Sequence, residues 1–233
     1  MKTGVVIPAA GSGKRMEREE NKVFLSLLGR PVLVYTLSLF WGHRDIHQLV
    51  LVGKEEELER YHSLVEEYFG AETGIRIVAG GDSRQESVFS GLENLDGGTD
   101  YVLIHDGARP LLSPRLRDAI MSEVRKKKAV VPALPLKETV KEVNERGIVR
   151  RTVPRHSLRA VQTPQAFSFS LLYRAYHQGL ISGRMMTDDA SFVEREMNFK
   201  IQIIPGCEEN IKLTTPHDLL LAEAILRARG EKE

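Results

Sequence analysis

One stretch near the N-terminus decides the fold, GVVIPAAGSGKRM at residues 4–16. Its first half is a nearly continuous apolar run, which is typical of a strand covered on both faces. Small residues and glycines follow, and they allow another molecule to approach the backbone closely. Ligands of open α/β sheets bind at this carboxyl edge of the strands. The amides, with Lys14 and Arg15, predict an anion site, most simply for phosphates; from this loop alone, a turn with solvated basic residues is the alternative.

The loop differs from two better-known phosphate-binding loops. A P-loop needs a glycine separated by four residues from its Gly-Lys pair and Ser or Thr after the lysine, but Pro8 and Arg15 stand at those positions. A dinucleotide-binding loop needs a third small residue where Met16 stands. The sequence therefore disfavours a P-loop NTPase and a dinucleotide-dependent dehydrogenase.

Further apolar runs extend the sheet that residues 4–10 begin. They are β-branched and nearly continuous, and they lie at residues 48–53, 74–79, 101–105 and 129–133. Helix signals separate them: an amphipathic pattern at residues 55–69, a capping box from Ser83 to Glu86, and the N-cap Ser113 followed by proline. This alternation predicts a mostly parallel α/β sheet.

The alternation breaks at Lys137. Residues 138–143 and 148–153 alternate polar and apolar around a turn signal at residues 144–147, which predicts a β-hairpin with few large apolar residues. Such a hairpin needs something to pack on, either the same chain or a partner subunit. Helices at residues 169–178 and 188–195, a strand at 200–204 and a last helix from Thr215 complete one domain with an inserted arm.

Composition bounds the function. The chain has 233 residues, 42% hydrophobic and 28% charged, with 33 Lys+Arg against 32 Asp+Glu. These values indicate a globular protein. The balanced charge argues against binding of long nucleic acid, because a protein that binds it through non-specific charge is normally more basic. Cys207 is the only cysteine, so no intrachain disulfide forms, and the apolar run near the N-terminus is too short for a signal peptide or a membrane span. We expect a cytoplasmic protein that binds no membrane.

Several segments carry a resemblance to a known family. Lys22 precedes FLSLLGRPVL at residues 24–33, as in nucleotidyltransferases that activate small phosphates. The other segments are GGDSRQESV at 80–88, HDGARP at 105–110, TPQAF at 163–167, TDDAS at 187–191 and NIKLT at 210–214. In this order, over nearly the whole chain, they resemble the 2-C-methyl-D-erythritol 4-phosphate cytidylyltransferases of non-mevalonate isoprenoid synthesis. The resemblance implies one Rossmann-like nucleotidyltransferase domain, residues 1–233, with a mostly parallel mixed sheet and residues 137–155 as a protruding β-hairpin dimerisation arm.

The implied reaction transfers a cytidylyl group from CTP to 2-C-methyl-D-erythritol 4-phosphate. The substrate phosphate attacks the α-phosphate in line, giving 4-diphosphocytidyl-2-C-methyl-D-erythritol and pyrophosphate. No covalent enzyme intermediate is needed, so the protein contributes positioning and charge stabilisation. Mg²⁺ is expected with the triphosphate; no residue cluster indicates a dedicated metal cage, and Asp106 is a possible ligand.

The resemblance also assigns residues. The implied catalytic residues are Arg15, Lys22, Arg155 and Lys212. The implied nucleotide-binding residues are Pro8, Ala9, Ala10, Gly11, Ser12, Gly13, Lys14, Gly81, Asp82, Ser87 and Asp106. The implied substrate-binding residues are Asp106, Arg109, Thr139, Arg155, Thr163, Thr187 and Lys212.

Some of these residues have a plain structural alternative. Asp106 alone is also typical of a turn, Arg109 of a loop brace, and Ser87 of an ordinary helical serine.

Partners and competing functions follow from the same resemblance. In the family the arm embraces a second subunit and completes its active site, so we expect a homodimer with shared sites. One alternative is a cytidylyltransferase for another polyol phosphate, such as ribitol 5-phosphate. Another is a non-catalytic nucleotide-binding regulator, against which the joint presence of Arg15, Lys22, Arg155 and Lys212 argues.

Overall fold

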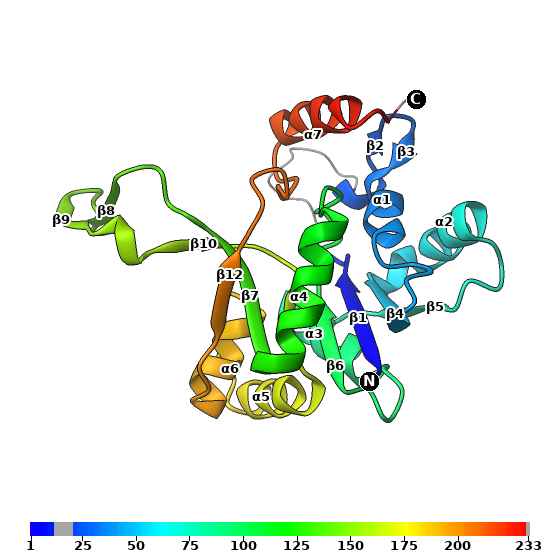
Figure 1. The fold of residues 1–233 in the computed structure, drawn as a ribbon, viewed down its shortest axis with the longest axis horizontal. Coiled ribbons are helices and arrows are strands. Elements are labelled where there is room, and N and C mark those ends of the chain that lie inside the picture. Colours follow the sequence, from blue (N-terminus) through cyan, green and yellow to red (C-terminus); the bar gives the residue numbers. More distant parts are fainter. Residues whose placement is uncertain (12–20, 232–233) are drawn as a thin grey trace.

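A mixed sheet forms the centre of the computed structural model, which describes residues 1–11 and 21–231. The strand order is β10-β7-β11-β6-β1-β4-β5, with β12 beside β7 (Figure 1). The strands are β1 (Thr3–Pro8), β4 (Ile46–Gly53), β5 (Ile75–Ala79), β6 (Tyr101–Ile104), β7 (Ala129–Pro135), β10 (Arg159–Val161), β11 (Gln165–Ser168) and β12 (Gln202–Pro205). The predicted mostly parallel mixed sheet is confirmed.

Two antiparallel strands were not predicted. β11 runs antiparallel between β6 and β7, and β10 pairs antiparallel with the far end of β7. Both are short, and their residues lack the continuous apolar run that marked the parallel strands. β11 nevertheless lies inside the sheet, between β6 and β7, and its residues Ala166 and Phe167 are therefore fully buried.

Helices cover both faces of the sheet. They are α1 (Val32–Ser38), α2 (Leu58–Phe69), α3 (Arg84–Glu93), α4 (Pro114–Lys127), α5 (Phe169–Ile181), α6 (Asp189–Met197) and α7 (Pro216–Ala228). Alternate residues of β1 face opposite layers: Val5 and Ile7 pack with α1, α2 and α4, whereas Val6 packs with α3, α5 and α6. A third apolar cluster seats α7 through Ala222 and Leu226. Among the helices within the described ranges, none combines the length and apolar character needed to cross a membrane.

The helix starts agree with the sequence signals. Ser83 and Glu86 form the predicted capping box of α3, and Ser113 caps α4, where proline takes the first helical position. Thr215 caps α7 in a second capping box with Asp218. Short 3-10 turns are present as well: η2 (Lys22–Phe24), η3 (Glu55–Glu57) and η4 (Arg155–Ser157). The strands β2 (Ser26–Leu27) and β3 (Arg30–Pro31) form a small separate hairpin.

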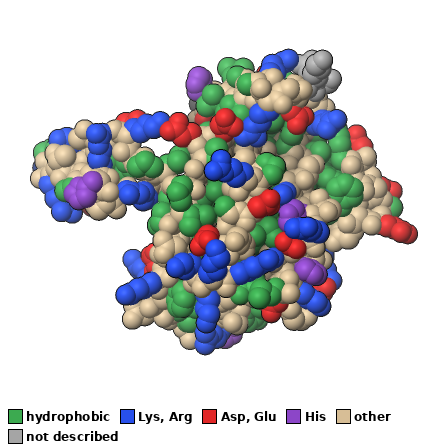
Figure 2. Space-filling model, viewed as in Figure 1, with side chains coloured by type: hydrophobic (Ala, Val, Ile, Leu, Met, Phe, Trp, Pro, Cys, Tyr) green, Lys and Arg blue, Asp and Glu red, His purple; other side chains and the backbone are tan. Residues whose placement is uncertain are grey.

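The predicted hairpin projects from the domain as an arm (Figure 1). Its strands, β8 (Val140–Val143) and β9 (Val149–Val153), form a sheet of their own, separate from the central one. Val143, Ile148 and Val149 are each at least half exposed. Figure 2 shows Lys and Arg side chains over the surface of the same arm. The arm thus exposes both apolar and basic side chains and has little core of its own.

Gly91 provides a test of how α3 packs on the sheet. A Cβ there would lie 2.3 Å from Val6 Cγ1 and 2.9 Å from Val52 Cγ2, both of them buried. Overpacking costs about 1–3 kcal/mol, more than the roughly 1 kcal/mol of helix propensity that alanine gains. Gly91→Ala should therefore lower the free energy of unfolding measured in urea.

Gly97→Ala is the matched control, since a Cβ at Gly97 meets no atom within 4 Å. We expect it to stay within about 0.5 kcal/mol of wild type. Equal stability of the two variants would contradict the packing of α3 against β1 and β4.

Candidate active site

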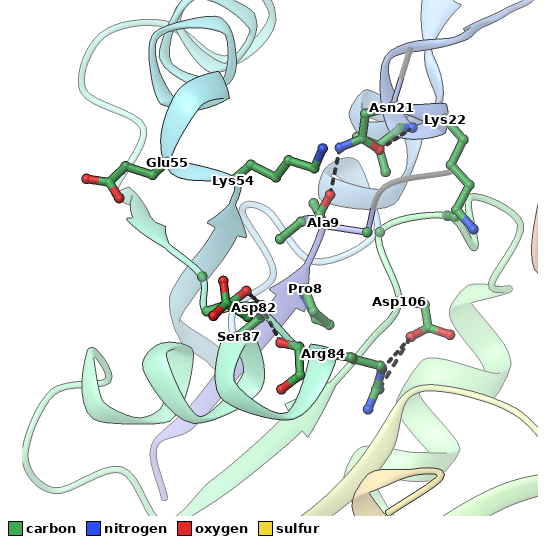
Figure 3. Close-up of a pocket in the computed structure, with 18 of the residues that line it drawn as sticks. Pro8, Ala9, Asn21, Lys22, Lys54, Glu55, Asp82, Arg84, Ser87 and Asp106 are labelled. Atoms are coloured by element: carbon green, nitrogen blue, oxygen red, sulfur yellow. Dashed lines mark hydrogen bonds and ion pairs between the residues drawn. The ribbon is translucent and has the colours of Figure 1, made fainter. Parts of the chain in front are cut away.

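A pocket lies at the carboxyl ends of β1, β4 and β6 and beside the start of α3 (Figure 3). Its volume is about 620 Å³, in the range that holds a nucleotide-sized ligand. The residues that line it are Pro8, Ala9, Ala10, Gly11, Asn21, Lys22, Val23, Lys54, Glu55, Glu56, Gly80, Gly81, Asp82, Ser83, Arg84, Ser87, Asp106, Gly107, Ala108, Lys212 and Thr214. The pocket thus occupies the edge of the sheet that residues 4–16 indicated.

Two buried polar side chains, those of Asn21 and Tyr61, hydrogen-bond to the backbone directly after β1. The side-chain amide of Asn21 and the hydroxyl of Tyr61 donate to the carbonyl of Ala9, at 2.9 and 3.0 Å. The amide of Ala9 donates to the carbonyl of Val52 in β4. These bonds fix the backbone at Ala9, at the edge of the pocket.

Two glycines form the wall on the α3 side. A Cβ on Gly80 would lie 2.5 Å from Ser87 Oγ, and one on Gly81 would lie 2.4 Å from Glu86 Cβ, so larger residues do not fit at either position. The Ser87 hydroxyl donates to the carbonyl of Ser83 at 2.9 Å, and its lone pairs are available as acceptors. Asp82 stands exposed at the rim. This wall offers close backbone approach to a flat group such as a base.

Asp106 is the buried carboxylate of the pocket, and three cations surround it. Lys212 Nζ lies 2.9 Å from its Oδ2, Arg109 Nε lies 3.5 Å from the same oxygen, and Arg84 Nη2 lies 3.4 Å from Oδ1. Burial alone would raise the pKa of Asp106, but Arg84, Lys212 and Arg109 outweigh it and hold that pKa well below its usual range. Asp106 is therefore ionised at neutral pH and is not a general base.

A hydrogen-bond chain behind Asp106 fixes the turn after β6. His105 Nε2 lies 3.0 Å from the carbonyl of Arg109, which can only accept, so Nε2 carries the proton. His105 Nδ1 then accepts from the hydroxyl of Thr163, and Thr163 Oγ1 accepts from the amide of Asp106 at 3.1 Å. Burial lowers the pKa of His105 to about 4. His105 is thus a neutral residue that supports the turn after β6.

The structure brings together only part of the predicted site. Pro8, Ala9, Ala10, Gly11, Lys22, Gly81, Asp82, Ser87, Asp106 and Lys212 all line the pocket. Thr163 and Arg109 lie directly behind Asp106, and Arg109 braces the loop by donating to the carbonyl of Asn210 at 2.7 Å. The predicted residues Ser12, Gly13, Lys14 and Arg15 lie outside the described residues.

Three predicted residues lie away from this pocket. Thr139 and Arg155 are exposed at the two ends of the hairpin arm, where Arg155 donates to the carbonyl of Lys137. Thr187 is exposed ahead of α6, with its hydroxyl 3.4 Å from that of Ser191. None of the three lines the pocket of its own chain.

Asn21, Lys54 and Arg84 are among the lining residues that sequence reasoning did not assign to the site. Asn21 and Lys54 lie at its β1 and β4 edges, and Arg84 lies beside Asp106 (Figure 3). Lys54 follows directly after β4, so the rule that ligands bind at the carboxyl ends of parallel strands was a signal for it. Arg84 lies between Ser83 and Glu86, which form the capping box of α3. The sequence pattern there indicates a helix start and gives no signal for the long-range contacts of Arg84.

The donors present determine what metal chemistry fits. Across residues 1–11 and 21–231, no group of three or more His, Cys, Asp or Glu side chains is placed to hold a metal ion. Asp106 and Asp82 are carboxylates of the pocket wall. One or two carboxylates beside substrate phosphates are what Mg²⁺ commonly takes. The residues therefore fit a Mg²⁺ that arrives with a polyphosphate.

A ligand with a flat base and several phosphates fits a pocket that combines a glycine-bordered wall with lysines. Together, this pocket and its place at the edge of a mostly parallel sheet define the class of Rossmann-like nucleotide-binding proteins.

Comparisons with known proteins narrow this class to a family. The family model for 2-C-methyl-D-erythritol 4-phosphate cytidylyltransferase matches residues 3–228. A protein of that name from Bacillus velezensis is 45% identical over 226 residues, covering 97% of this chain and 96% of the relative. The chain belongs to the 2-C-methyl-D-erythritol 4-phosphate cytidylyltransferase family. It is an enzyme, a CTP-dependent cytidylyltransferase of the non-mevalonate isoprenoid pathway.

Solved structures agree with this assignment. The 4-diphosphocytidyl-2C-methyl-D-erythritol synthase of Anaerococcus prevotii is 34% identical, with a TM-score of 0.84, covering 97% of this chain and 98% of that one. The 2-C-methyl-D-erythritol 4-phosphate cytidylyltransferase of Thermus thermophilus is 33% identical, with a TM-score of 0.78 and coverages of 97% and 100%. The arrangement of sheet and helices is therefore the family's own.

The neutral His105 makes the stability of the fold depend on pH. The unfolded chain takes up a proton on this imidazole near pH 6.5, whereas the folded protein does so only near pH 4. The contribution of the neutral His105 to the free energy of unfolding is therefore complete above pH 6.5. It falls by about 3 kcal/mol as the pH decreases from 6.5 to 4. Urea unfolding across this range should show the slope, and the NMR signals of His105 should stay unchanged above pH 5. Titration of these signals near pH 6.5 would contradict the buried hydrogen-bond chain.

Proposed function

We propose that the pocket holds CTP with its base and ribose against the Gly80–Gly81 wall and its triphosphate along the turn after β1. The phosphate of 2-C-methyl-D-erythritol 4-phosphate then lies beside Lys212. The observation that carries this proposal is the ammonium of Lys212, fixed 2.9 Å from the buried Asp106 at the pocket wall. A cation anchored in this way is ready to receive an anion without reorganising.

The chemistry requires that two anions meet. The acceptor phosphate is ionised at neutral pH and attacks the α-phosphorus without a general base, while pyrophosphate leaves on the opposite side. Lys22 lines the pocket and neutralises charge that grows on the α-phosphate and the leaving group, a role that the resemblance also implies for Arg15. A well-placed donor of this kind contributes on the order of 10²–10³-fold in rate.

Mg²⁺ belongs to the proposal as a companion of CTP. Asp106 and Asp82 are the carboxylates that would hold it, and the ion would supply charge neutralisation on the triphosphate. Both oxygens of Asp106 already face cations, Arg84 at Oδ1 and Lys212 and Arg109 at Oδ2, so the protein would contribute few ligands and the phosphates would contribute the rest. CTP is made and kept inside cells, which supports a cytoplasmic location.

A substrate panel tests this function. Pyrophosphate release should be measured with CTP, Mg²⁺ and each of several polyol phosphates, and with ATP in place of CTP. We expect turnover with 2-C-methyl-D-erythritol 4-phosphate and a loss of about 10²-fold or more for Lys22→Ala, with the fold intact by circular dichroism. Robust turnover only with ribitol 5-phosphate would replace the proposed substrate. Unchanged turnover of Lys22→Ala would remove Lys22 from its role.

We further propose that the enzyme is a homodimer and that the arm completes the partner's site. Thr139 and Arg155, at the ends of the arm, do not line the pocket of their own chain. The arm also exposes Ile148, Val149 and several cations at a distance from its own domain (Figures 1 and 2). An isolated two-stranded hairpin is marginal in water, so contact with a second subunit accounts for its order.

Mixed dimers test this sharing of residues. Arg155→Ala and Lys212→Ala should each lose activity, because each removes one cation near the acceptor phosphate. Unfolded and refolded together, they should form heterodimers in which one site has both residues, so about a quarter of all sites become active again. Deletion of residues 141–151 should give inactive monomers in analytical ultracentrifugation.

The control mixture is Lys22→Ala with Lys212→Ala. Both residues line the same pocket, so a heterodimer of these variants has one defect in each site and should recover no activity. Absence of recovery in the Arg155→Ala mixture, or a fully active monomer, would contradict the shared site.

A further inference from the structure

Arg84 connects two carboxylates that come from different parts of the chain. Its guanidinium donates to both oxygens of Asp189, with distances of 2.9 Å and 2.8 Å, and its Nη2 also lies 3.4 Å from Asp106 Oδ1. Figure 3 shows this side chain leaving the start of α3 and reaching toward Asp106. A planar group with five donors can serve two carboxylates at once, which an ammonium cannot do with the same geometry.

The Asp189 side of this connection is deeply buried. Asp189 is 0% exposed and accepts a bond from Tyr176 Oη at 2.5 Å. Just before it, Asp188 accepts from Gln165 Nε2 at 2.8 Å, and the side-chain Oε1 of Gln165 accepts from the backbone amide of Ala190. The start of α6, which directly follows Thr187, is therefore fixed to the sheet and to Arg84.

On its other side, Arg84 influences Lys212 through Asp106. Arg84 contacts Oδ1 of Asp106, and Lys212 contacts Oδ2. The orientation of this carboxylate therefore depends on both cations. The connected series is Asp189, Arg84, Asp106 and Lys212. Asp189, at one end of the series, lies close in sequence to Thr187. Arg84 is the first residue of α3, on the nucleotide wall, and Lys212, at the other end, is the cation proposed to bind the acceptor phosphate.

We propose that Arg84 is a positioning residue that aligns the acceptor-binding side of the site, Lys212 and the segment at Thr187, with the nucleotide wall at α3. This inference rests on the proposed function, because that function gives Lys212 and Thr187 their roles. Arg84 acts through Asp106 and Asp189 and does not itself contact the reacting atoms.

Kinetics should separate this role from a purely structural one. Arg84→Met should raise KM for 2-C-methyl-D-erythritol 4-phosphate and lower kcat, by roughly 10- to 100-fold in kcat/KM, because misplacement of a binding group by a fraction of an ångström is costly. KM for CTP should change far less. Arg84→Lys should restore only part of the loss, since an ammonium cannot reach both carboxylates.

Tyr176→Phe is the matched control. It also removes a buried hydrogen bond to Asp189, but Tyr176 has no contact with Asp106 among the described bonds. We expect it to lower the unfolding temperature by less than Arg84→Met does, because Asp189 keeps its cation, and to leave both KM values near wild type. A double-mutant cycle of Arg84→Met with Lys212→Ala should be strongly non-additive in kcat/KM, whereas Tyr176→Phe with Lys212→Ala should be additive.

A crystal structure of Arg84→Met gives a readout that needs no activity. We expect Asp106 to rotate and the distance from Lys212 Nζ to Asp106 Oδ2 to change from 2.9 Å. An unmoved Asp106–Lys212 pair, or additive behaviour in the first cycle, would overturn the positioning role. Wild type that turns over no polyol phosphate would overturn the proposed function, and the crystal structure would still decide the role of Arg84.

Discussion

The ionised carboxylate of Asp106 is the group on which the geometry of the site depends. Burial disfavours its charged form, and cations from three separate segments offset this desolvation. They are Arg84 at the start of α3, Arg109 in the turn after β6, and Lys212 ahead of α7. Removing any one partner of such a cluster leaves the others poorly compensated. The cluster therefore holds three loops in one arrangement, and this arrangement forms one side of the pocket.

The parts of the fold that the sequence could predict are those with local signals. β1, β4, β5, β6 and β7 are continuous apolar runs, and α3, α4 and α7 begin at side chains that cap them. β11 escaped prediction because its place depends on two strands remote in sequence, β6 and β7, and not on its own short pattern. The alternation rule finds a strand with two covered faces but does not say which distant strand inserts beside it.

The same division applies to the site. Lys22, Asp106 and Lys212 were found through motifs, and the structure places all three on one pocket. Arg84 was missed because its two carboxylate partners are 22 and 105 residues away, and nothing in its neighbourhood announces them. Thr139 and Arg155 were predicted through the resemblance, but they do not line the pocket of their own chain, and their role in a partner's site stays a prediction.

A net charge of +1 also acquires a physical meaning from the pocket. A site made of cations alone would repel itself before any substrate arrived, and its lysines would have no fixed direction. Asp106 removes part of that repulsion and orients Lys212. With Asp189, which pairs with Arg84, it leaves one positive charge in excess among Arg84, Arg109 and Lys212. Two anionic substrates can therefore each neutralise part of a charge that is already in place. A balanced charge over the whole chain is therefore compatible with a local positive excess around Asp106, and that local excess favours the approach of an anion.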